Sequence, residues 1–210
     1  MINKISKVWH IVLFDTQSPG IQIYRLKWNQ EAVILYINRN GMTRIGLISD
    51  THGFLDASVF DHFSHCDEVW HAGDFGTIDI AENLRKGFLP RNVVMRGVYG
   101  NIDGKDVRVV YPEKNHFKCE EVNVFMQHIG GYPGRYAPGV KKEIQQSGAG
   151  LFISGHSHIL KVMFDPALQC MHMNPGAAGK QGWHTMRARI RFVIDVKDIK
   201  DCEVIELGRK

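Results

Sequence analysis

Seven side chains of this 210-residue chain have the types and positions to bind metal ions. Each follows a short apolar run, and the set is Asp50, His52, Asp74, Asn101, His128, His156 and His158. Oxygen and nitrogen ligands without sulfur suit Mn²⁺, Fe, Zn²⁺, Ni²⁺ or Co²⁺ and disfavour Ca²⁺. Seven ligands are too many for one catalytic ion. We therefore expect two ions about 3.5–4 Å apart with one bridging carboxylate.

Each motif alone also has a structural explanation. An Asp after a strand, such as Asp50, is typical of a helix N-cap. Gly73-Asp74 and Gly100-Asn101 are typical turn dipeptides. The alternate histidines His156 and His158 have few structural reasons to follow a strand. All of these motifs in this order, each after its own strand, favour metal binding over structural explanations.

Apolar runs and helical spacing predict the elements that position these residues. In the first half we expect strands over 44–49, 68–72 and 92–99, with helices over 57–65 and 78–87 between them. This alternation predicts a parallel sheet with crossover helices. Open α/β sheets place ligands at the carboxyl ends of their strands, so we expect the candidates to converge on one rim.

The second half is richer in strands. Extended runs cover 122–127, 151–154, 159–164, 169–173 and 189–196, and a helix is expected over 139–147. A mixed second sheet packed on the first would account for all five strands. The expected fold is therefore α/β, with two mixed β-sheets packed as a sandwich and flanked by α-helices.

Composition and charge exclude several classes of protein. With 44% hydrophobic and 23% charged residues, the chain is neither disordered throughout nor fibrous. No apolar run is long enough to span a membrane. Residues 1–41 hold five basic and two acidic side chains and supply +3 of the net charge of +4. The remainder is nearly neutral, so we do not expect a nucleic-acid-binding face.

The cysteines and the N-terminal segment bear on localisation and domains. Four widely spaced cysteines indicate reduced thiols and a cytoplasmic protein. The apolar run at 8–14 contains a histidine and lacks a cleavage site, so no signal peptide is expected. Residues 1–41 form an extension, either a hairpin of 21–28 and 32–37 around Asn29-Gln30 or a segment with little structure. Residues 42–210 form the functional domain.

The motifs also resemble those of a known family. Asp50-x-His52, Gly73-Asp74, Gly100-Asn101, His128 and Gly155-His156-x-His158 are similar, in order and spacing, to the calcineurin-like metallophosphoesterase superfamily. The short chain, its small C-terminal sheet and Asn174-Pro175-Gly176 look most like the YfcE-type phosphodiesterase branch, which includes the metallophosphoesterase-like subunit of retromer. The resemblance covers about residues 42–207.

The resemblance implies a site and a reaction. One metal is implied to be held by Asp50, His52, Asp74 and His158, with Asp74 bridging to a second metal completed by Asn101, His128 and His156. We expect Mn²⁺ first, with Ni²⁺, Zn²⁺, Fe or Co²⁺ as alternatives. The implied activity is that of a phosphodiesterase, in which a hydroxide bridging the metals attacks phosphorus in line. Asp74 and Asn101 are the expected catalytic residues, together with Asp103, which would orient a ligand from behind.

Two departures from the family pattern affect the expected chemistry. Many relatives have a histidine, credited with protonating the leaving group or holding the phosphate, where this chain has Ile102. We therefore expect aryl esters to be good substrates and alkyl esters to be slow. The loop Gln127–Gly131 also differs from the usual Gly-His-Gly-His.

Several alternatives stay open. They are a catalytically weak protein-binding scaffold, a phosphomonoesterase and, with Arg135, Lys141 and Lys142 as its only local basic residues, a nuclease. We expect a small phosphate-ester substrate, no membrane and no nucleic acid, and leave a homo-oligomer open. The remaining histidines are expected to be surface or packing residues, and they are His10, His62, His65, His71, His116, His172 and His184.

Overall fold

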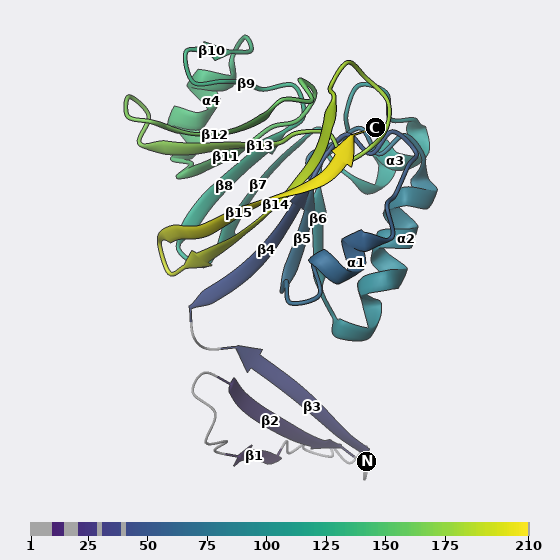
Figure 1. The fold of residues 1–210 in the computed structure, drawn as a ribbon. Helices are drawn as coiled ribbons and strands as arrows, with labels where there is room; N and C mark the ends of the chain where they lie inside the picture. The colour runs from purple at the N-terminus through teal and green to yellow at the C-terminus, as the bar shows by residue number, and fades with distance from the viewer. Residues whose placement is uncertain (1–9, 15–20, 29–30, 39–40, 210) are drawn as a thin grey trace, which may run out of the picture. The chain divides into compact units, whose positions relative to one another are not determined.

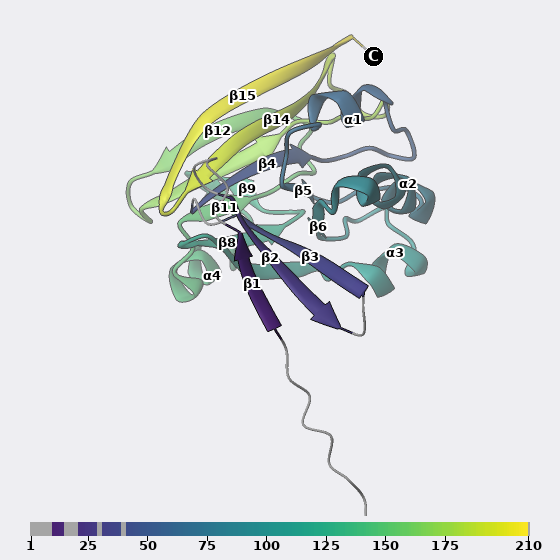
Figure 2. The same ribbon diagram turned by 90° about the horizontal axis from the view of Figure 1, so that it is seen from below.

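The computed structural model describes residues 10–14, 21–28, 31–38 and 41–209, and Figures 1 and 2 show its ribbon from two directions. The chain divides into two compact units, Met1–Met42 and Thr43–Lys210. The first unit contains an antiparallel sheet in the order β1-β2-β3, made of β1 (His10–Phe14), β2 (Ile21–Trp28) and β3 (Glu31–Asn38). The turn expected at Asn29-Gln30 lies outside the described residues.

The larger unit is built on two five-stranded sheets. The first has the order β15-β14-β4-β5-β6, in which β4, β5 and β6 run parallel. The first half of the larger unit comprises β4 (Met42–Ile48), α1 (Ser58–His62), β5 (Glu68–His71), α2 (Ile78–Phe88), the 3₁₀ turn η1 (Leu89–Arg91), β6 (Val94–Gly97) and α3 (Lys105–Val110). The strand–helix alternation follows the predicted pattern, and α3 was not predicted.

The second sheet has the order β12-β13-β11-β8-β7. It is mixed, because β8, β11 and β13 run parallel whereas β7 and β12 pair antiparallel with their neighbours. Its elements are β7 (Lys114–Cys119), β8 (Val122–Gln127), the hairpin of β9 (Gly131–Tyr132) and β10 (Arg135–Tyr136), α4 (Val140–Ser147), β11 (Leu151–Ile153), β12 (Leu160–Asp165) and β13 (Cys170–Pro175). The predicted fold class, two mixed sheets with flanking helices, is confirmed.

One strand was assigned to the wrong sheet. The run at 189–196 was expected in the second sheet, but β14 (Met186–Asp195) lies beside β4 in the first and pairs with β15 (Asp198–Arg209). Ile190, Phe192 and Ile194 of β14 enter the same apolar cluster as Met126 of the second sheet. The inner faces of both sheets contribute to one core, so alternation along a strand does not reveal its sheet.

Helices cover the outer faces of both sheets, with α1, α2 and α3 on one side of the unit and α4 on the other (Figure 1). The sequence of α2 explains its place, because Ile80, Ala81, Leu84 and Phe88 recur on one helical face and are all buried. Helices therefore cover part of each outer face, whereas the edge strands β12 and β15 are mostly exposed. Among the described residues, no helix has the length and hydropathy needed to cross a membrane.

Candidate metal centre

The predicted ligand residues lie in loops that directly follow strands. These loops follow β4, β5, β6, β8 and β11 and carry, in that order, Asp50 with His52, Asp74, Asn101, His128, and His156 with His158. Five of these residues have left-handed backbone, with φ from 48° to 66°, namely Asp50, His52, Asp74, His156 and His158. Such a conformation costs roughly 1–3 kcal/mol at a non-glycine residue and concentrates at functional sites.

Backbone hydrogen bonds hold the loops after β4 and β5 in this conformation. The N–H of Asp50 donates to the carbonyl of Gly73 at 3.0 Å, and the N–H of His52 donates to the carbonyl of Asp74 at 3.0 Å. The two loops therefore form one unit, and they present their carboxylates and imidazole from a common backbone frame.

A buried histidine supports the same two loops from behind. His71 accepts the N–H of Gly73 at Nδ1 (3.2 Å), so its Nε2–H donates to the Thr51 hydroxyl at 3.0 Å. Its ring also stacks on Phe75, with 3.6 Å between centroids. Burial lowers the pKa of His71 to about 3. His71 is thus a neutral packing residue, in line with its prediction.

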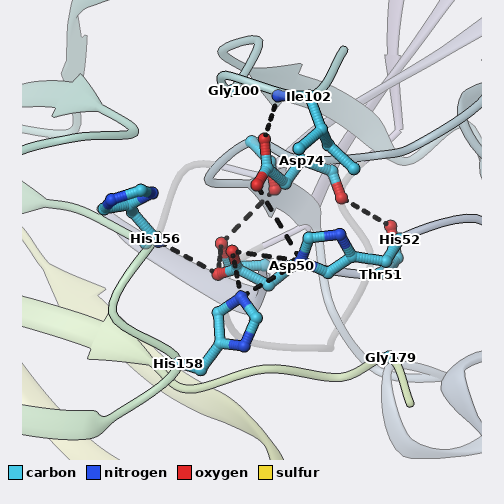
Figure 3. Close-up of polar contacts among 12 residues, drawn as sticks. Asp50, Thr51, His52, Asp74, Gly100, Ile102, His156, His158 and Gly179 are labelled. Atoms are coloured by element: carbon cyan, nitrogen blue, oxygen red, sulfur yellow. Dashed lines mark hydrogen bonds and ion pairs between the residues drawn. The ribbon is translucent and has the colours of Figure 1, made fainter. Parts of the chain in front are cut away.

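Six of the seven candidates form two groups, each with ligand atoms within 4.8 Å of one another. The first group is Asp50, His52 and His158, and the second group is Asp74, His128 and His156. Nε2 of His158 lies 3.2 Å from Asp50 Oδ1 and 3.0 Å from His52 Nε2 (Figure 3). Nε2 of His128 lies 3.2 Å from Asp74 Oδ2. Ligand atoms that are each about 2.1 Å from one ion lie roughly 3.0–3.4 Å apart, so these distances suit shared ligation.

Asp74 connects the two groups. Its Oδ2 lies 3.2 Å from Nε2 of His128 in the second group and 3.8 Å from Nε2 of His52 in the first. Its Oδ1 accepts the N–H of Ile102 at 3.0 Å (Figure 3). A carboxylate between two sets of ligand atoms has the position expected of a bridging ligand.

The buried atoms that face the groups fit a cation. Oδ2 of Asp50 accepts the hydroxyl of Ser49 at 2.6 Å and the N–H of His156 at 3.2 Å. Within the described part of the chain, Oδ1 of Asp50 and Nε2 of His128 are buried without a hydrogen-bond partner. Buried polar atoms are normally satisfied. A divalent ion in each group would satisfy both atoms, so the residues present fit the metals that the sequence predicts.

Protonation states of Asp74, His52 and His156 suit metal binding, whereas the pKa of His128 is raised, because burial is outweighed by the hydrogen bond to Asp74 and the charge of Asp50. Burial raises the pKa of Asp74, but the His128 imidazole and the Ile102 N–H outweigh this effect, and the net pKa is lowered. Burial lowers the pKa of His52 and of His156, and the nearby carboxylates only partly oppose it. Ionised carboxylates and neutral imidazoles are the forms that coordinate a divalent ion.

The far nitrogens of two ligand imidazoles have partners that fix their orientation. Nδ1 of His128 lies 2.7 Å from the carbonyl of Ala72, to which it donates. Nδ1 of His158 lies 3.2 Å from Nδ1 of His184. His184 was predicted to be a surface or packing residue, and a loop brings it against a ligand candidate 26 positions earlier.

Two further predicted site residues, Asn101 and Asp103, lie in the loop after β6. Asn101 is exposed and lines, with His128, a pocket of about 470 Å³ whose wall also includes Tyr99, Arg108 and Ile129. Asp103 is buried, and its carboxylate accepts the N–H groups of Gly76 (2.8 Å) and Gly100 (2.7 Å). Asp103 therefore joins the loops that carry Asp74 and Asn101 and orients them through the backbone.

Comparison with known proteins gives a consistent assignment. Residues 43–198 match the calcineurin-like phosphoesterase superfamily domain. A probable metallophosphoesterase of Methanothermobacter thermautotrophicus is 30% identical over 140 residues, which cover 63% of this chain and 76% of that protein.

Solved structures share the fold. A Thermotoga maritima protein determined by NMR in solution has a TM-score of 0.57 and 22% identity, covering 79% of this chain and 99% of that chain. The zinc complex of Vps29 from Entamoeba histolytica has a TM-score of 0.53 and 16% identity, covering 78% of this chain and 98% of that chain.

Proposed function

Because the chain belongs to the calcineurin-like phosphoesterase superfamily, we propose that it is a two-metal phosphodiesterase acting on small phosphate esters. One observation carries the proposal: two groups of ligand atoms lie side by side, and the carboxylate of Asp74 reaches both. Divalent ions there would supply Lewis acidity. They would neutralise charge on the phosphoryl oxygens and lower the pKa of water, so that it can lose a proton and act as a nucleophile near neutral pH. We propose Mn²⁺ as the ion, with Zn²⁺, Ni²⁺, Fe and Co²⁺ as alternatives.

Different residues of the chain would bind the metals and orient the substrate. Asp50 and Asp74 provide buried negative charge that favours cations over neutral ligands. His128 is fixed by the carbonyl of Ala72, so its Nε2 needs no reorientation to coordinate. Asn101 faces the pocket next to His128 and would hold a metal or a phosphoryl oxygen through its amide.

The pocket beside Asn101 and His128 is the proposed position of an ester substituent. Its volume of about 470 Å³ is within the usual range for sites that bind small molecules. Ile102, next to Asn101, is 45% exposed and cannot donate a proton to a leaving oxygen. We therefore expect esters of acidic alcohols such as phenols to be hydrolysed faster than alkyl esters.

The test is hydrolysis of bis-p-nitrophenyl phosphate and p-nitrophenyl phosphate by metal-stripped protein after Mn²⁺, Ni²⁺, Zn²⁺ or Mg²⁺ is added back. Activity with the diester should exceed that with the monoester, should require metal, and should fall about 10²-fold or more in His128→Ala. His65→Ala is the matched control, because His65 is exposed and outside both groups. A preference for the monoester would replace the phosphodiesterase proposal with a phosphomonoesterase.

A protein-binding scaffold with the same fold is the second candidate. It is favoured by Ile102 and Ile129, which are 45% and 43% exposed and follow the ligand candidates Asn101 and His128 in the chain. Exposed aliphatic side chains beside a binding centre suit a protein partner. Wild-type protein that binds metal and hydrolyses neither ester would favour this candidate over the enzyme.

A further inference from the structure

The inference concerns His184, in the loop that joins β13 to β14. Its ring lies between a carbonyl and a metal ligand candidate. Nε2 of His184 lies 3.2 Å from the carbonyl oxygen of Gly179, and Nδ1 lies 3.2 Å from Nδ1 of His158.

Hydrogen-bond chemistry determines the protons in this chain of contacts. A carbonyl oxygen only accepts, so Nε2 of His184 carries a proton and donates to Gly179. Nδ1 of neutral His184 then has a lone pair and accepts Nδ1–H of His158. As a result, the lone pair of His158 is on Nε2, the atom that lies 3.2 Å from Asp50 Oδ1.

The loop is shaped to keep His184 in this position. Gly179 N–H donates to the carbonyl of Asp50 at 2.9 Å, which attaches the start of the loop to the first group. Gly182 has φ +109°, and a Cβ there would lie 2.2 Å from Nδ1 of His158. Only glycine allows the loop to pass this close to the His158 ring.

We propose that His184 is a positioning residue that fixes the tautomer and ring orientation of His158 for metal binding by the first group. The Ala72 carbonyl orients His128 in the same way, but there the hydrogen-bond acceptor is a main-chain group, whereas here it is a side chain. Partners behind metal-binding histidines typically contribute about 10- to 100-fold in affinity. The inference rests on the proposed metal site.

The first measurement is titration of metal-free protein with Mn²⁺ or Zn²⁺ by calorimetry. In His184→Ala we expect one of two sites to weaken by about 10- to 100-fold and the other to stay as in wild type. His184→Asn should restore much of the affinity, because its side-chain oxygen can accept Nδ1–H of His158. Trp183→Ala is the matched control, since Trp183 is in the same loop and its side chain is fully exposed.

The second measurement is imidazole ¹⁵N NMR of metal-free protein, which reports tautomers directly. Wild type and His184→Asn should show His158 protonated on Nδ1, and His184→Ala should show a mixture of tautomers. Unchanged affinity and tautomer in His184→Ala would overturn the inference while leaving the metal site in place. Equal losses in Trp183→Ala would also overturn it. Wild-type protein that binds no divalent metal would overturn the proposed function as well.

Discussion

The first and second ligand groups have similar ligand atoms but different supports behind them. In the second group, His128 is buried and its Nδ1 donates to the main-chain carbonyl of Ala72. In the first group, Asp50 is held by the Ser49 hydroxyl and His158 by the His184 ring. A carbonyl support is insensitive to the side chain at its position, whereas a side-chain support is lost by one substitution. Truncation of the His184 side chain therefore removes the support of His158, whereas truncation of the Ala72 side chain would leave the support of His128 in place.

The largest effect should come from removing the residue that both groups share. Asp74→Asn keeps the size of the side chain but removes the charge between the groups, so we expect kcat/KM to fall about 10³-fold or more. Metal analysis of the purified variant should find less than two ions per chain.

The control for Asp74→Asn is Asp79→Asn, at an exposed position in the first turn of α2. Full metal content and activity in Asp74→Asn would show that the two groups work independently.

The next effect compares two ligands within the second group. His128 is 2% exposed and fixed by Ala72, whereas His156 is exposed. A preorganised ligand loses little freedom on binding, so we expect His128→Ala to lower kcat/KM about 10²-fold or more and His156→Ala to lower it less. Metal titration and steady-state kinetics of both variants measure this. Equal losses would mean that burial does not set the contribution of a ligand here.

A gain of function is expected from a substitution at Ile102, whose N–H donates to Asp74. Ile102→His adds a group able to protonate a leaving oxygen, and we expect alkyl phosphodiesters to be hydrolysed about tenfold faster. This is below the roughly 10²- to 10⁴-fold of a well-placed general acid. Rates with aryl esters should change little, and Ile102→Gln, which cannot supply an acid, is the control. If the rates with both ester types changed by the same factor, the slow hydrolysis of alkyl esters would not be due to the lack of a general acid at position 102.

The smallest expected effect is on the pH dependence of folding stability, and it comes from a histidine outside the ligand set. His172, in β13 beside β11, is buried, contacts the Ser154 hydroxyl at 2.9 Å, and has its pKa lowered by burial to about 4. Its folded pKa lies below the unfolded value, so the unfolded chain takes up the proton first. Stability contributed by neutral His172 is complete above about pH 6.5 and is lost as pH falls toward 4, by at most about 1.4 kcal/mol per pH unit.

Urea denaturation of metal-free protein between pH 7 and pH 4.5 tests this slope. His172→Gln should flatten it, and His65→Ala, at an exposed histidine, should not. An unchanged slope in His172→Gln would assign the acid sensitivity to other groups.

The convergence of the candidate ligands was predictable because chemistry and topology coincide there: each candidate ends an apolar run, and parallel strands bring those ends together. Elements without a continuous apolar run were missed. β7 alternates exposed and half-buried residues, and β15 is mostly exposed, so backbone pairing to a neighbouring strand defines both. α3 spans six residues, too few for a helical period to be evident. His184 was missed because only a folded loop reveals its contact with His158.

The left-handed backbone at five candidate ligand residues has an evolutionary consequence. Glycine adopts this conformation at no steric cost, so replacing any of these residues with glycine would relax the loop while deleting a ligand. Selection for thermal stability alone should therefore favour glycine at these positions. The resulting proteins would be more stable but would no longer bind metal. Retention of Asp or His at all five would identify lineages in which metal binding is still under selection.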